Sequence, residues 1–347
     1  MHPKEIEMKA LKRQDIMASL LVAGADPNKI NDAGQTPLDI SVSAGDLDSV
    51  KYLLGGGAQV VHQQYSTETH TAIKSSLRSG NLISLKTLLR RKPSLINYRQ
   101  KTGFTLMHLA AEAGANNIIE YLNEHGVSLN SRSHTGDTPV HVAVNSGRIR
   151  TLECLMTCGA RIDIPNEEGN TPLHVAWSMP SMIKILVMAG ADTEYANLVG
   201  AMPIHVAAKK GALAAVAQLL ECGASISCHD FDGRQVIHVA IHYPEVMQLL
   251  IDKNADIDVK DFYGEAPLHV AVQEVCSDSV ELLLKAGADA SIQNHHGDTP
   301  LHFATLKGDL NLVDILLEHG SNPDLANIRG YTPLHSVALS ALSDRKF

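Results

Sequence analysis

Histidine is the residue type in this chain that most readily suggests chemistry. The chain has 18 histidines among 347 residues, and imidazole can act as a general base or a metal ligand near neutral pH. Eight of them end variants of the tetrapeptide Thr-Pro-Leu-His, namely His108, His141, His174, His205, His238, His269, His302 and His335. No nucleophile elbow, zinc-protease helix, kinase signature or phosphate-binding glycine loop accompanies them. We therefore expect no catalytic residues and no enzymatic activity.

Metal binding is the second chemistry that histidines suggest. His238 and His242 lie four residues apart, a spacing at which two residues on one helix face can chelate a metal. His238 occupies the recurring slot, however, which favours a structural role. The five cysteines form no C-x-x-C pair, and they are typical of a reducing compartment. The sequence therefore predicts no metal site and no cofactor.

The histidines mark a repeat. Successive members of the series are 33 or 31 residues apart, and two weaker copies precede them, TPLD ending at Asp39 and TAIK ending at Lys74. A small-residue helix start follows each copy, then a Leu-rich segment, a glycine turn and a hairpin tip such as DFYG. Thr favours the helix cap, Pro the first helical position and Gly the left-handed exit. Each unit is therefore expected to contain two short antiparallel helices and a hairpin.

This pattern resembles the ankyrin repeat, which has a 33-residue period and the signature T-P-L-H-x-A. The resemblance covers nearly the whole chain. It implies an all-α repeat solenoid of stacked helix-turn-helix units with β-hairpin loops, in which the signature imidazole bridges Thr and backbone groups within its repeat. We expect a single array over residues 1–347: an N-terminal half or capping repeat (1–31), nine full repeats (32–324) and a C-terminal half repeat (325–347).

Two repeats are two residues shorter than the others, and each carries a proline, Pro180 or Pro244, where the second helix should begin. Proline fits the first helical position, so it can replace the usual glycine-containing turn. Trp177 and Ile241 then fill a slot that holds Ala111 or Ala208 elsewhere. The pattern leaves open whether Trp177 is a packing residue or a binding residue.

The charge distribution is uneven. The chain has a formal net charge of -9, yet residues 69–104 contain no Asp or Glu. The basic residues of this stretch are Lys74, Arg78, Lys86, Arg90, Arg91, Lys92, Arg99 and Lys101. They form either a solvated face or a site for an acidic protein segment or a phosphoinositide head group. The net negative charge of the chain argues against nucleic acid as a partner.

The resemblance also implies where a partner protein binds, because ankyrin partners usually lie across the hairpin tips and the concave ends of the first helices. Three consecutive tips carry large apolar side chains, and a contiguous apolar stripe on a surface is typical of an interaction site. The candidate protein-binding residues are Leu198, Val199, Phe231, Phe262, Tyr263, Trp177, Tyr243, His295 and His296. The alternative is that the tip aromatics pack sideways on one another.

The sequence thus favours a non-catalytic protein-interaction scaffold or adaptor. The alternative is the recruitment or tethering portion of a larger protein, such as an enzyme, a channel or a secreted bacterial effector. No apolar run reaches the roughly 18 residues of a membrane span, and residues 1–15 do not read as a signal peptide. We expect a monomeric array in the cytoplasm, or in the host cytosol for an effector.

Overall fold

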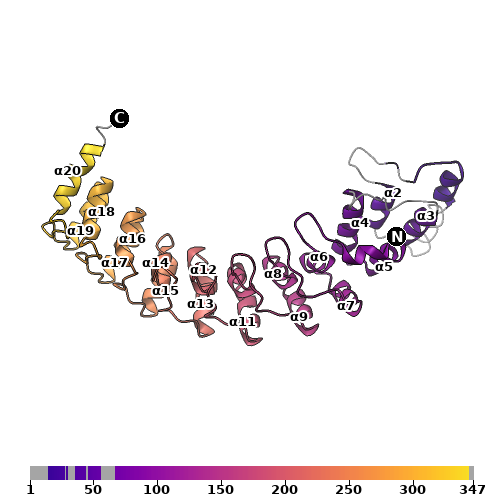
Figure 1. The fold of residues 1–347 in the computed structure, drawn as a ribbon, viewed down its shortest axis with the longest axis horizontal. Coiled ribbons are helices and arrows are strands. Elements are labelled where there is room, and N and C mark those ends of the chain that lie inside the picture. The colour runs from indigo at the N-terminus through magenta and orange to yellow at the C-terminus, as the bar shows by residue number, and fades with distance from the viewer. Residues whose placement is uncertain (1–14, 28, 30–35, 44–45, 56–66, 344–347) are drawn as a thin grey trace, which may run out of the picture. The chain divides into compact units, whose positions relative to one another are not determined.

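The computed structural model describes residues 15–27, 29, 36–43, 46–55 and 67–343 (Figure 1). The chain divides into two compact units. Unit 1 covers residues 1–167 and unit 2 covers residues 168–347. Regular structure in the described residues is helical, apart from isolated antiparallel bridges between Arg99 and Thr105 and between His229 and Gln235. None of the described helices is long and apolar enough to cross a membrane.

Unit 1 contains pairs of helices in two rows. Its helices are α2 (Pro37–Ser43), α3 (Leu47–Gly55), α4 (Thr67–Arg78), α5 (Leu82–Arg91), α6 (Leu106–Ala113), α7 (Asn116–Glu124), α8 (Pro139–Asn145) and α9 (Ile149–Thr157), with a 3-10 turn at Pro93–Asn97. The first helices α2, α4, α6 and α8 contact one another in order. The second helices form the other row, in which α3 contacts α5 and α7 contacts α9.

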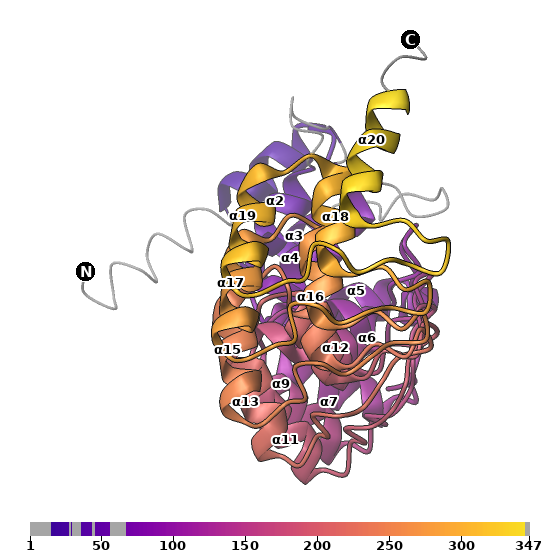
Figure 2. The same cartoon turned by 90° about the vertical axis from the view of Figure 1, so that its left-hand side faces the viewer.

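Unit 2 repeats this arrangement. Its helices are α10 (Pro172–Val175), η2 (Ala176–Ser178), α11 (Pro180–Met188), α12 (Pro203–Lys209), α13 (Leu213–Glu221), α14 (Val236–Val239), α15 (Pro244–Asp252), α16 (Pro267–Gln273), α17 (Ser277–Lys285), α18 (Pro300–Lys307), α19 (Leu310–Glu318) and α20 (Pro333–Ser343). In Figure 2 the second helices α13, α15, α17 and α19 form one column, and the first helices α12, α16 and α18 form the next. The loops that carry the tips lie beyond the first helices.

The helices form where the signature places them, and the signature threonines stand at the N-cap as predicted, but their hydroxyls differ in the groups that they bond. The Thr138 hydroxyl accepts the backbone N–H of His141 at 3.5 Å. Thr105, Thr171 and Thr299 make no side-chain cap bond of this kind. Their hydroxyls lie 2.8–2.9 Å from the histidine Nδ1 instead. The signature threonine therefore mainly holds the imidazole.

The two shortened repeats confirm the role predicted for their prolines. Pro180 begins α11 and Pro244 begins α15, while the preceding first helices α10 and α14 are cut to four residues each. Ile241 is buried, so it is a core residue in its repeat. Trp177 is only half-buried, and the Nζ of Lys210 lies 5.8 Å from the centroid of its ring.

Each unit therefore shows the expected helix pairs, and the described residues fit the predicted repeat fold. Most of the predicted N-terminal half repeat, together with residues 30–35 and 56–66, lies outside the described residues. The C-terminal half repeat is present as α20, whose described part ends at Ser343. One uninterrupted array over residues 1–347 stays a prediction.

Candidate functional site

Five large apolar side chains are exposed on three consecutive tips of unit 2, and we call them the apolar tip surface. They are Leu198, Val199, Phe231, Phe262 and Tyr263, with exposed fractions between 54% and 70%. Backbone hydrogen bonds join these tips: Phe231 N donates to Val199 O at 3.3 Å, and Phe262 N donates to Asp232 O at 3.0 Å. The structure thus brings together residues that are up to 65 positions apart in the chain.

The turns beneath these side chains are held by a polar residue at the base of each loop. Asn197 Oδ1 accepts the backbone N–H groups of Val199 at 3.1 Å and of Ala201 at 2.9 Å. Asp230 and Asp261 accept the equivalent pair of N–H groups in the next two loops, all at 2.9 Å. Side chains on turns fixed in this way are pre-ordered for contact, which lowers the entropic cost of binding.

The tip phenylalanines pack sideways on the backbone of the preceding tip, which differs from the alternative that the tip aromatics pack on one another. A Cβ atom at Gly200 would lie 2.5 Å from Cδ1 of Phe231, and one at Gly233 would lie 2.5 Å from Cδ1 of Phe262. Each ring therefore lies over the glycine of the preceding tip. Even so, 67% of Phe231 and 64% of Phe262 remain exposed. The rings thus combine a packing role with a large free apolar face.

The row of exposed tips continues past Tyr263. His295 N donates to Tyr263 O at 3.2 Å, and both His295 and His296 are exposed. The next tip exposes 72% of Ile328, whose N–H donates to His296 O at 3.0 Å. Ile328 is absent from the predicted site, although the repeat register places it at a tip.

Two of the predicted binding residues lie away from the tips. Trp177 is in η2, and its contact with Lys210 places it at the C-terminal end of the first helix α12, whereas the tips lie at its N-terminal end. A seven-residue helix separates these ends by about 10 Å. Tyr243 is half-buried, and three of its ring carbons lie 2.3–2.8 Å from the position that a Cβ atom of Gly211 would take. Trp177 and Tyr243 therefore do not extend the apolar tip surface.

The eight basic residues of the second full repeat are divided among three elements of unit 1. Lys74 and Arg78 lie on the first helix α4, while Lys86, Arg90 and Arg91 lie on the second helix α5, which Lys92 ends. Arg99 and Lys101 belong to the following loop, where Arg99 Nη1 donates to the carbonyl oxygens of Gly103 and Arg132.

The side chains on α5 also have local roles. The Nζ of Lys86 lies 4.7 Å from the centroid of the Tyr121 ring. Arg90 and Arg91 occupy the last helical turn, where positive charge is favourable to the helix dipole. The basic stretch is therefore contiguous in sequence but is carried by three different elements.

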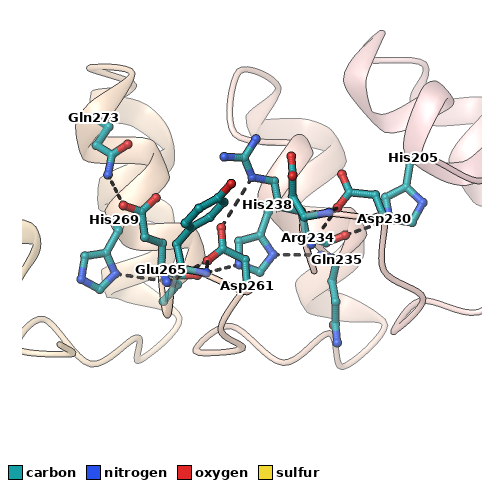
Figure 3. Close-up of polar contacts among 12 residues, drawn as sticks. His205, Asp230, Arg234, Gln235, His238, Asp261, Glu265, His269 and Gln273 are labelled. Carbon is teal, nitrogen blue, oxygen red and sulfur yellow. Dashed lines mark hydrogen bonds and ion pairs between the residues drawn. The ribbon is translucent and has the colours of Figure 1, made fainter. Parts of the chain in front are cut away.

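Seven of the eight signature histidines are buried structural groups, whereas His335 is exposed. His238 shows the pattern: its Nδ1 accepts the backbone N–H of Gln235, and its Nε2 lies 3.1 Å from the carbonyl oxygen of Glu265 (Figure 3). An amide N–H can only donate and a carbonyl can only accept, so the ring is the neutral tautomer with the proton on Nε2. The acceptor belongs to the next repeat, 27 residues further on. The prediction of a bridge within one repeat is therefore confirmed for Nδ1 and corrected for Nε2, whose partner belongs to the next repeat.

Burial favours the neutral form of His108, His205, His238 and His269. Desolvation lowers the pKa of His108 and of His269 to about 4, although both rings donate to a backbone carbonyl. The pKa values of His205 and His238 are lowered for the same reason. A neutral ring with both nitrogens bonded is a poor candidate for proton transfer or metal binding.

One histidine outside the signature lies beside a cysteine side chain. His242 Nδ1 lies 3.1 Å from Cys276 Sγ at the surface of unit 2. Burial, with the charges of Glu274 and Asp278, raises the pKa of the Cys276 thiol, which disfavours the nucleophilic thiolate. Because the nitrogens of His238 are bonded elsewhere, His238 and His242 do not form a chelating pair. Across the part of the chain that the structure describes, no three His, Cys, Asp or Glu side chains are placed to hold a metal ion.

Comparison with known proteins agrees with this structural reading. A family model described as ankyrin repeats in three copies matches residues 7–100, 107–197, 204–294 and 268–344. B-cell lymphoma 3 protein of Homo sapiens is 34% identical over 103 residues, covering 28% of this chain and 23% of that protein. The E3 ubiquitin-protein ligase KEG of Arabidopsis thaliana is 25% identical over 281 residues, covering 72% of this chain and 15% of that protein.

Solved structures of ankyrin repeat domains are also similar to this chain. The crystal structure of the ankyrin repeat domain of Bcl-3, described as a unique member of the IkappaB protein family, aligns with a TM-score of 0.53 and 33% identity. The alignment covers 58% of this chain and 95% of that one. The chain spans less than a quarter of the length of the two curated relatives. With family matches along nearly its whole length, this chain belongs to the ankyrin repeat family.

Proposed function

We propose that this chain is a non-catalytic scaffold or adaptor that binds a partner protein through the apolar tip surface of unit 2. Ankyrin repeats mediate protein–protein interaction, and they are generally non-catalytic modules. The observation that carries the proposal is the row of exposed side chains from Leu198 to Tyr263 on hydrogen-bonded tips. Phe and Tyr at such positions are typical anchors of interfaces, because each buries a large area with little loss of side-chain freedom.

In this proposal the side chains on the tips of unit 2 make the main contacts with the partner protein. His295 and His296 continue the row with groups that can donate or accept hydrogen bonds, as the polar rim of an interface does. Trp177, with Lys210 over its ring, and Tyr243 lie near the C-terminal ends of the first helices, where they can contact a partner that reaches across from the tips.

Differential capture from an extract of the source cells tests the proposal. Wild-type chain is compared with the triple variant Phe231→Ala, Phe262→Ala, Tyr263→Ala, and with a control carrying Lys101→Ala and Glu167→Ala at polar tips. A partner that is retained by wild type and by the control but lost from the triple variant supports the proposal. Capture of the same proteins by all three chains contradicts it.

A second function has one observation in its favour. The match to the ligase KEG extends over 72% of this chain but only 15% of that protein, so a related array is one part of a larger enzyme there. In such a protein this array would recruit a substrate for the enzyme or tether the enzyme to another protein. Both roles are compatible with the same binding surface. Measurement of the mass of the native polypeptide by immunoprecipitation and mass spectrometry distinguishes the two settings.

A further inference from the structure

A polar groove of about 320 Å³ lies in unit 1, at the C-terminal ends of the first helices α4 and α6. Three cationic side chains line it: Lys74, Arg78 and Arg148. Glu112 is the single carboxylate among the lining residues, so the lining has an excess of two positive charges. We call this feature the basic groove. It is separate from the apolar tip surface, which belongs to unit 2.

The cations are positioned by three parts of the chain. Lys74 and Arg78 are one helical turn apart on α4, so they project from the same face. Arg148 precedes α9, and its Nε donates to the backbone carbonyl oxygen of Glu112 at 3.3 Å. The Cδ of Arg148 lies 3.4 Å from where a Cβ of Gly114 would be, so the stem of this side chain follows the backbone.

The surroundings make these charges effective. Leu77 and Leu109 line the groove and are almost fully buried, so an apolar wall lies beside the cations. Charges next to a low-dielectric wall interact with a ligand more strongly than charges surrounded by water. Arg148 is exposed and has further N–H donors beyond the one that it gives to Glu112. The groove therefore offers both net charge and directed donors to an anion.

We propose that the basic groove binds an acidic segment of a protein, whose Asp or Glu carboxylates pair with Lys74, Arg78 and Arg148. A planar carboxylate matches the guanidinium fork, and an extended peptide can follow the line from α4 to Arg148. A phosphoinositide surface fits less well, because binding to anionic lipid typically uses clusters of four to eight basic residues. The groove holds three, and the nearby cations Arg90 and Arg91 stand on α5 of the other helix row.

Fluorescence anisotropy with a labelled twelve-residue Glu/Ser peptide tests the proposal on the full chain at low ionic strength. A Gln/Ser peptide of equal length is the neutral control. Lys74→Glu, Arg78→Glu, Arg148→Glu should weaken binding of the acidic peptide at least tenfold. The matched variant Arg90→Glu, Arg91→Glu, Lys92→Glu changes the net charge equally and should bind within twofold of wild type.

A second variant distinguishes a loss of binding from a loss of folding. Lys74→Gln, Arg78→Gln, Arg148→Gln removes the charges without adding repulsion and should still lose several-fold in affinity while retaining wild-type helicity. Equal losses in the two charge-reversal variants, or no loss in the groove variants, would overturn the proposal. Binding of vesicles containing phosphoinositide without binding of the acidic peptide would overturn it too. None of these results would overturn the proposed binding of a partner by the apolar tip surface, because no groove variant changes a residue of unit 2.

Discussion

Acidification should destabilise this protein through its buried histidines, and the size of the effect follows from their pKa values. His108 in unit 1 and His269 in unit 2 have pKa values of about 4, against 6.5 for the ordinary side chain. Between these values the unfolded chain takes up protons that the folded chain does not, so the free energy of unfolding falls as the pH falls. The stabilisation is present above about pH 6.5 and is lost progressively toward pH 4.

The magnitude can be worked out for one ring. At pH 5 an unfolded histidine is almost fully protonated while the folded one is almost fully neutral, which amounts to about 2 kcal/mol lost per residue relative to pH 7.5. The lowered pKa values of His205 and His238 add in the same direction. Urea denaturation followed by helical circular dichroism at pH 7.5 and pH 5 measures the loss.

Glutamine provides the matched variant. At the third helical position its side-chain oxygen can accept the same backbone N–H as Nδ1 does, and it takes up no proton in this range. His108→Gln and His269→Gln should therefore each recover about 2 kcal/mol of the loss between pH 7.5 and pH 5. Variants with the same pH dependence as wild type would refute the reasoning, because the buried rings would not then be the groups that titrate.

Two further substitutions test the local structure. His302→Ala should lower the free energy of unfolding by about 1–2 kcal/mol, because Thr299 N–H and the carbonyl oxygen of Tyr331 lose their partner; an unchanged urea midpoint would show that the bridge between repeats contributes nothing. Gly233→Ala should destabilise unit 2 by more than about 1 kcal/mol, since φ is +79° and the new Cβ would lie 2.5 Å from the Phe262 ring. Wild-type stability of this variant would mean that the tip has room to rearrange.

The fold was predictable because each repeat contains the residues that specify its own helices and turns. The tetrapeptide ending in His302, the alanine that follows it and the Leu-rich segment each specify a helix or its boundary by local chemistry. Pro180 and Pro244 even marked the shortened repeats, where they begin α11 and α15 as expected. The bridge from His238 to Glu265 was not predictable in the same way, since it joins groups of different repeats.

The binding surfaces were only partly predictable, because proximity in space is not proximity in sequence. Phe231 and Phe262 were recognised as neighbours because the repeat period places tips in register. The basic stretch runs through α4, α5 and a loop, so a single site formed by all eight of its charges stays a prediction. Arg148 joins Lys74 at the groove from two repeats further along, and nothing in the local sequence connects them.

The central claim is that the tip aromatics bind a partner and are not required for folding. The most direct test measures thermal unfolding and, by titration calorimetry, affinity for the captured partner in the variant Phe231→Ala, Phe262→Ala, Tyr263→Ala. The account predicts stability within about 0.5 kcal/mol of wild type for each exposed position. It also predicts a loss of binding free energy of about 2 kcal/mol or more, roughly thirtyfold in affinity. A variant that unfolds several degrees early but binds its partner normally once folded would contradict it, because the rings would then serve packing alone.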